Sequence, residues 1–162
     1  AIAAMDVTEE RAKQVDFSNI YYENSAVFVA AQGKFSDAAQ LTGKNVGVQN
    51  GTSHQSYLLE QLKGKEAKVV LYASYQNALM DLTSGRVDAV FADTAVAAEW
   101  LKSHAGYQMV GQPVTDAKYF GAGFAIAVNK GNKALLDSLN QGLAAIKANG
   151  TYQKLYAKYF SK

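Results

Sequence analysis

The sequence predicts an α/β fold whose central sheet is rich in parallel strands. After Lys44, short apolar runs alternate with stretches of helical period. The runs that predict strands are 46–49, 69–72, 88–92 and 107–110, and the stretches that predict helices between them are 53–62, 74–82 and 94–103. Strands joined by helices of about ten residues form parallel sheets with right-handed crossovers. Residues from about 32 to 120 therefore predict one complete α/β unit.

The rest of the chain predicts fewer strands. A short helix is expected at 8–13, where Thr8 is a typical N-cap, and a strand of β-branched and aromatic residues at 25–31. A second extended passage, rich in small residues, follows at 121–128. Leucines at helical spacing predict a helix at 132–148, and a last helix is expected at 151–160.

Composition excludes several functional classes. The 162 residues are 49% hydrophobic and 19% charged, which is typical of a chain that builds a core. The net charge is only +2 and the basic residues are scattered, so a nucleic-acid interface is not expected. The absence of cysteine excludes disulfides and thiolate chemistry. Two isolated histidines offer no metal-site spacing, and no cofactor motif occurs.

An acid and a guanidinium stand five residues apart at the start of the chain. Asp6 can accept from an ammonium group, and Arg11 can donate two parallel hydrogen bonds to a carboxylate. Such a pair can hold both ends of a free α-amino acid. An isolated Arg11 would equally be an ordinary surface residue.

Polar residues also follow two predicted strands. Gln49 ends the first strand of the α/β unit, Thr52 and Ser53 open the next helix, and Asp93 ends another strand. Ligands of open parallel sheets bind beyond the carboxyl ends of the strands, and a helix N-terminus attracts a carboxylate. Thr52 or Ser53, and Asp93 likewise, could instead serve only as helix caps.

Four motifs in order carry a resemblance to a known family. They are Ala4 to Arg11, Gly43 to Ser53, Leu82 to Asp93 and Asn149 to Tyr156. Over essentially the whole chain, the sequence resembles the periplasmic amino-acid-binding proteins of ABC importers, the bacterial solute-binding proteins of family 3, and is most similar to the arginine-binding members. The resemblance implies a two-lobe periplasmic-binding-protein-like fold of type II.

The family pattern begins with further strands and a helix before the Asp6 segment. The sequence is therefore interpreted as a C-terminal portion that lacks about the first seventy residues. The expected organisation is part of lobe 1 with a first hinge strand at 1–30, a complete lobe 2 at 31–121, and a second hinge strand with the C-terminal part of lobe 1 at 122–162. The incomplete lobe would leave apolar residues without partners, among them Phe17, Val27, Leu139 and Leu143.

The resemblance also implies roles for individual residues. Arg11, Thr52 and Ser53 would bind the carboxylate of the ligand, and Asp6 and Asp93 its ammonium group. Ala4 would contribute its carbonyl, and Gln49 would face the ligand side chain or be a neutral residue at a strand end. His54 is expected on the surface of its helix.

The function implied is that of a receptor for an L-amino acid, arginine or another cationic one. It would deliver its ligand to a membrane ABC permease by hinge closure, in the periplasm or anchored outside a cell without an outer membrane. Residues that select the ligand side chain would lie in the absent segment, so this chain alone is expected to bind weakly or not at all. The alternatives are a dehydratase or lyase on the same fold, which would need a cleft acid with a tuned pKa, and the sensing domain of a membrane receptor.

Overall fold

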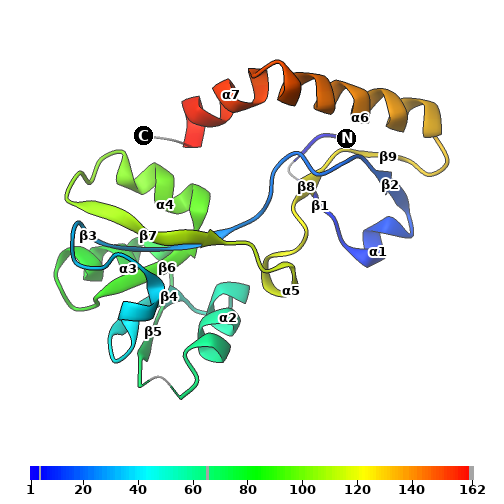
Figure 1. The fold of residues 1–162 in the computed structure, drawn as a ribbon. Coiled ribbons are helices and arrows are strands. Elements are labelled where there is room, and N and C mark those ends of the chain that lie inside the picture. The colour runs from blue at the N-terminus through cyan, green and yellow to red at the C-terminus, as the bar shows by residue number, and fades with distance from the viewer. Residues whose placement is uncertain (4, 65, 161–162) are drawn as a thin grey trace. The chain divides into compact units, whose positions relative to one another are not determined.

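The computed structural model describes residues 1–3, 5–64 and 66–160, and it divides into two units (Figure 1). The first unit combines residues 1–24 with 121–162, and the second is the continuous segment Ser25–Phe120. Each unit is described below by itself.

The second unit is built on a five-stranded sheet in the order β5-β4-β6-β3-β7. Its elements are β3 (Ala26–Ala31), a 3₁₀ turn (Ala38–Leu41), β4 (Asn45–Gln49), α2 (Ser53–Gln61), β5 (Lys68–Tyr72), α3 (Tyr75–Thr83), β6 (Ala89–Asp93), α4 (Thr94–Leu101), β7 (Tyr107–Val114) and α5 (Ala117–Phe120). Strands β5 and β6 both pair with β4 in parallel, and β3 runs antiparallel to β6 and to β7. The four strands after Lys44 therefore share one direction, as predicted. Strand β3 lies between β6 and β7 and runs in the opposite direction.

The two faces of this sheet carry separate apolar cores. Alternate residues of β3 point to opposite faces, so Phe28 packs on Phe91 on one side, with ring centroids 4.5 Å apart, while Val27 and Val29 pack on the other. Leu58 of α2 contributes to the first core. The second core receives the apolar faces of α3 and α4, through Leu79, Leu82, Ala97 and Leu101. Two covered faces explain why β3 and β6 read as continuous apolar runs.

The predicted boundaries 1–30, 31–121 and 122–162 differ from this division mainly at the first crossing. Strand β3 lies inside the second unit because both of its neighbours, β6 and β7, belong to that unit. Val27, expected to lack partners, is fully buried there. The chain therefore passes between the units at Asn24-Ser25 and again at Phe120-Gly121.

In its described residues, the first unit contains two small antiparallel pairs and three helices. Its elements are β1 (Met5–Asp6), α1 (Glu9–Ala12), β2 (Val15–Phe17), β8 (Phe124–Ala125), β9 (Ala127–Asn129), α6 (Lys133–Ala148) and α7 (Thr151–Phe160). Strand β1 pairs with β8, and β2 pairs with β9. These pairings join the two chain segments of the unit across more than a hundred residues of sequence.

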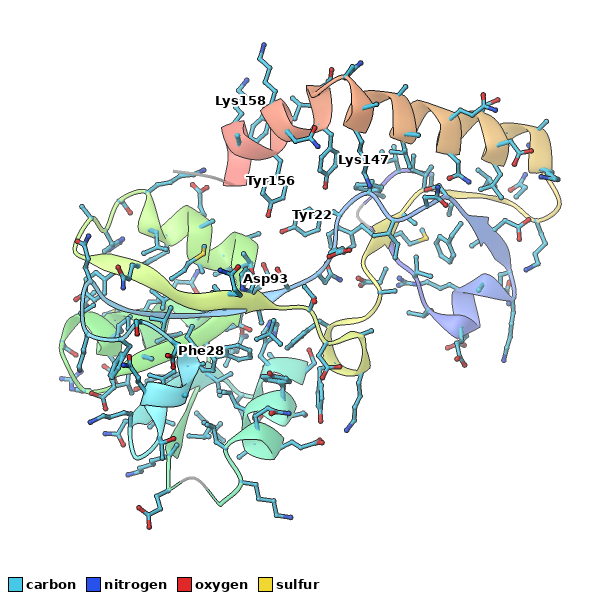
Figure 2. All side chains as sticks on the ribbon, in the orientation of Figure 1. Tyr22, Phe28, Asp93, Lys147, Tyr156 and Lys158 are labelled. Atoms are coloured by element: carbon cyan, nitrogen blue, oxygen red, sulfur yellow. The ribbon has the colours of Figure 1, made fainter. Side chains whose placement is uncertain are left out.

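The C-terminal helices of the first unit attach to the segment before the crossing. The Tyr152 hydroxyl donates to the carbonyl of Tyr21, and Figure 2 shows Tyr156 of α7 directed toward Tyr22, with ring centroids 6.4 Å apart. Helix α6 is amphipathic, yet none of its residues is buried, and Leu135 is 46% exposed. An amphipathic helix normally buries its apolar face. The apolar face of α6 is therefore only partly covered, as predicted for Leu139 and Leu143.

Candidate functional site

The second unit brings the ends of β4 and β6 together. The two strands are parallel neighbours, with Val46 opposite Ala89 and Gly47 opposite Val90. Gln49 and Asp93 are their last residues, and helices α2 and α4 begin directly beyond them. Two helix N-termini therefore lie at one edge of the sheet, which is where open α/β sheets bind ligands.

Thr52 caps α2 with its side chain. Its hydroxyl oxygen accepts from the backbone N–H of Gln55 at 3.2 Å and donates to the carbonyl of Gln49 at 2.8 Å. These two hydrogen bonds fix the turn that joins β4 to α2. The adjacent Ser53 is exposed on the first turn of α2, where backbone amides point outward along the helix axis.

Asp93 is the N-cap of α4 and lies at the end of β6 (Figure 2). Its Oδ1 atom accepts from the backbone N–H groups of Ala95 and Val96 at 2.8 and 3.3 Å. Asp93 therefore caps α4. A carboxylate has about four acceptor positions, so these two bonds leave capacity for a ligand ammonium.

His54 lies in an aromatic cluster, which contradicts the expectation of a surface residue. Its ring centroid is 5.0 Å from that of Phe120, 5.8 Å from that of Phe91 and 5.9 Å from that of Tyr75. Burial lowers the pKa of His54, and the charge of Asp93 partly opposes this effect. The sequence around His54, the second residue of α2, did not indicate burial, because the rings that cover it come from β6, α3 and α5, far away in the sequence.

Two buried polar atoms of this cluster, His54 Nε2 and Tyr75 Oη, lack hydrogen-bond partners within the described part of the chain. Burial raises the pKa of Tyr75 to about 12, and the nearby charge of Asp93 acts in the same direction. Thr52 lies near enough to favour the ionised form slightly, but no hydrogen bond of ordinary geometry joins the two hydroxyls. His54 and Tyr75 thus lie within the electrostatic reach of Asp93, a relationship that the sequence did not indicate.

The first unit holds Asp6 and Arg11 close together. Arg11 Nη1 donates to the backbone carbonyl of Asp6 at 3.0 Å, while Asp6 Oδ1 accepts from the side-chain amide of Asn24 at 2.7 Å. Thr8 caps α1 as predicted, and the guanidinium of Arg11 remains exposed. Arg11 therefore presents charged donors that can meet a carboxylate.

The other predicted residues are less constrained. Gln49 Nε2 donates to the carbonyl of Ala73 at 3.4 Å, a long bond that holds the side chain weakly. Ala4 lies outside the described residues. Among the residues that the structure describes, His, Asp and Glu form no group that could hold a metal ion, and no helix has both the length and the apolar character needed to cross a membrane.

Comparison with known proteins identifies one family over the whole chain. The profile of the bacterial extracellular solute-binding proteins, family 3, matches residues 1–162. The ABC transporter arginine-binding protein 1 of Escherichia coli K12 is 52% identical over 159 residues, which are 98% of this chain and 65% of that protein. The chain thus spans slightly less than two thirds of this curated relative.

Two solved structures illustrate the likeness of fold. A Salmonella typhimurium periplasmic binding protein described for its high arginine specificity is 43% identical, with a TM-score of 0.60 over 98% of this chain and 70% of that chain. The substrate-binding domain 2 of Lactococcus lactis GlnP, in an open conformation, is 26% identical, with a TM-score of 0.86 over 98% of this chain and 68% of that chain. The expected type II periplasmic-binding-protein fold is confirmed by these matches.

Proposed function

Because the chain belongs to the bacterial extracellular solute-binding proteins of family 3, we propose that it forms the larger part of an amino-acid receptor. Its ligand is an L-amino acid, arginine or another cationic one. The 52% identity to an arginine-binding relative supports this choice of ligand. The receptor works outside the cytoplasm, in the periplasm, and delivers its ligand to a membrane ABC permease.

The observation that carries the proposal is the placement of Asp93. It ends β6, next to the strand end from which Thr52 and Ser53 open α2. An ammonium group near Asp93 and a carboxylate near the amides of α2 would each meet the opposite charge. An α-amino acid carries these two groups on one carbon atom, so it fits such an edge.

The first unit supplies the remaining charges in this proposal. Arg11 binds the ligand carboxylate, and Asp6 binds its ammonium group together with Asp93. A buried zwitterion must be fully paired, because an unpaired charge in a dry site costs several kcal/mol. Two acids and one guanidinium meet that requirement for the head group.

The proposed mechanism is closure of the two units on the ligand. A ligand shifts a conformational equilibrium only through its different affinity for the two states. Contacts from both units provide that difference, and the crossings at Asn24-Ser25 and Phe120-Gly121 act as the hinge. The receptor makes and breaks no covalent bond, so it needs neither a nucleophile nor a general base.

Titration of the isotope-labelled chain with L-arginine, followed by NMR and by calorimetry, tests the proposal. We expect weak binding, near the millimolar range, with resonance changes at Ser53 and Asp93. The changes should be lost in the Arg11→Gln variant and kept in the control Arg86→Gln, whose guanidinium instead pairs with Asp81 at 2.7 Å.

Two outcomes would contradict parts of this assignment. The absence of any response up to the solubility limit of arginine would contradict binding by this site. Micromolar affinity would contradict the expectation that this chain supplies only part of the ligand contact.

A further inference from the structure

We propose that Asn24 and Ser25, the dipeptide at the first crossing, are positioning residues for the two ammonium-binding acids. Asn24 orients Asp6, and Ser25 orients the strand end that carries Asp93. This inference rests on the proposed function, because that function gives the two acids their role.

Asn24 determines the direction of the Asp6 carboxylate. Its Nδ2 atom donates to Asp6 Oδ1 at 2.7 Å, the length of a strong hydrogen bond to a charged acceptor. The backbone of Asp6 is fixed separately, since Asp6 pairs with Phe124 across β1 and β8 and its carbonyl accepts from Arg11. Asn24 therefore restricts the remaining freedom of Asp6, which is rotation about its side-chain torsions.

Ser25 fixes the residue that follows Asp93. Its Oγ donates to Thr94 Oγ1 at 2.8 Å, and its carbonyl accepts from Thr94 N at 2.9 Å. Thr94 is 9% exposed, so its hydroxyl depends on this partner. The next residue, Ala26, lies directly opposite Asp93 in the β3–β6 ladder. The contacts between β3 and β6 thus continue one residue beyond the Ala26–Asp93 pair, through the bonds of Ser25 to the hydroxyl and the amide of Thr94.

The two sets of contacts belong to adjacent residues of the chain. Each acid is held within its own unit, Asp6 through Asn24 and Asp93 through Ser25 and Thr94. A change of backbone torsion between Asn24 and Ser25 therefore acts on the supports of both acids. The hinge dipeptide thus supports each acid within its own unit as well as linking the two units along the chain.

The experiment compares the full chain with Asn24→Ala, Ser25→Ala and Ser25→Thr. The Ser25→Thr variant retains the hydroxyl and should rescue the loss seen in Ser25→Ala. Asn140→Ala is the matched control, because Asn140 bonds the backbone N–H of Asn19 in the same unit, away from Asp6. Thermal unfolding of every variant establishes that it remains folded.

The first readout needs no ligand. The carboxyl-carbon NMR resonance of Asp6 should move in Asn24→Ala, and that of Asp93 should move in Ser25→Ala. Both should stay in place in Asn140→Ala. An Asp6 resonance that is unchanged in Asn24→Ala would overturn the inference, whether or not arginine binds.

The second readout separates positioning from general damage. Asn24→Ala should weaken arginine binding about ten-fold, the effect of one hydrogen bond to a charged group. Binding of δ-guanidinovalerate, which is arginine without the α-amino group, should be unchanged, since it does not use the two acids. Equal weakening for both ligands would overturn the positioning role and leave the proposed function intact. A wild-type chain that shows no response to arginine would instead contradict the proposed function, and with it the ligand role of both acids.

Discussion

Gly123 lies directly against the backbone carbonyl of Tyr22, which also accepts a hydrogen bond of 2.7 Å from the amide of Phe124. The φ angle of Gly123 is +117°, and a Cβ atom there would lie 2.8 Å from Ile20 Cγ2 and 3.2 Å from Glu23 Cα. Only glycine accepts both this torsion and this approach. The contact joins the second crossing of the chain to the segment that precedes the first.

The Gly123→Ala variant should therefore be destabilised, by about 1–3 kcal/mol or more, because strain and overlap act together. Thermal unfolding measures the effect. Gly142→Ala is the matched control: Gly142 lies within α6, and a Cβ atom added there would meet no atom within 4 Å, so alanine should stabilise the helix by about 0.5–1 kcal/mol. Equal melting temperatures for the two variants would contradict the close approach at Gly123.

Asp93 allows the capping role to be separated from the ligand role. Asp93→Ala should lose the bonds to Ala95 and Val96, at a cost of about 1 kcal/mol of stability, and should also lose arginine binding. Asp93→Asn keeps a good cap but removes the charge, so it should preserve the melting temperature and still lose binding. Ser74→Ala, which truncates the cap of α3, is the control for cap loss alone. Unchanged affinity in Asp93→Asn would show that Asp93 serves only the helix.

The partly buried His54 predicts a loss of stability in acid. Burial lowers its pKa from the ordinary value of 6.5, so the unfolded chain binds more protons than the folded chain between the two pKa values. Stability should therefore rise with pH through this window and fall as the pH drops below about 6.5. The second unit should carry this dependence.

The His54→Leu variant tests this prediction through urea unfolding at a series of pH values. Leucine does not titrate, so the variant should lose less stability between neutral and mildly acidic pH than the wild type. His104→Gln, which removes the other histidine, is the control for the loss of a histidine as such. The same acid sensitivity in His54→Leu and the wild type would contradict a buried neutral His54.

The partly covered helices of the first unit predict self-association. Leu135, Leu155 and Tyr159 are 46%, 50% and 55% exposed on α6 and α7, and exposed apolar side chains promote association when they gather in a patch. Gel filtration of the full chain should show an apparent size that grows with concentration. The fragment 25–120 should remain monomeric and unfold cooperatively, because both of its cores are contained within it. A sharp monomer at all concentrations of the full chain would contradict this prediction.

Local sequence patterns predicted the strands and the helices α2, α3 and α4 of the second unit to within a few residues, but neither α5 nor the 3₁₀ turn. Apolar alternation and caps such as Thr52 and Ser74 are local signals, and the structure contains both caps. The place of β3 was not predictable in this way, because its partners β6 and β7 are chosen by long-range pairing. The inward orientation of His54 has the same cause, since distant rings cover it.

The candidate site was predictable to a similar extent. Strand ends and helix starts placed Gln49, Thr52, Ser53 and Asp93 at one edge of the sheet, and the structure has β4 and β6 as neighbours there. The hydrogen bond from Asn24 to Asp6 could not be predicted from the sequence, because asparagine is common in turns whether or not it bonds an acid. Whether these residues bind a ligand stays a prediction that the experiments above address.

The continuity of the second unit has a consequence for biosynthesis. Residues 25–120 leave the ribosome as one uninterrupted stretch that carries both of its cores, so this unit can fold while translation continues. Strand β2 must wait much longer, since Val15 pairs with Asn129, which is made only after the whole second unit. The nascent protein therefore exposes an unpaired β2 edge until β9 has been synthesised, and this interval is when a holding chaperone would act on it.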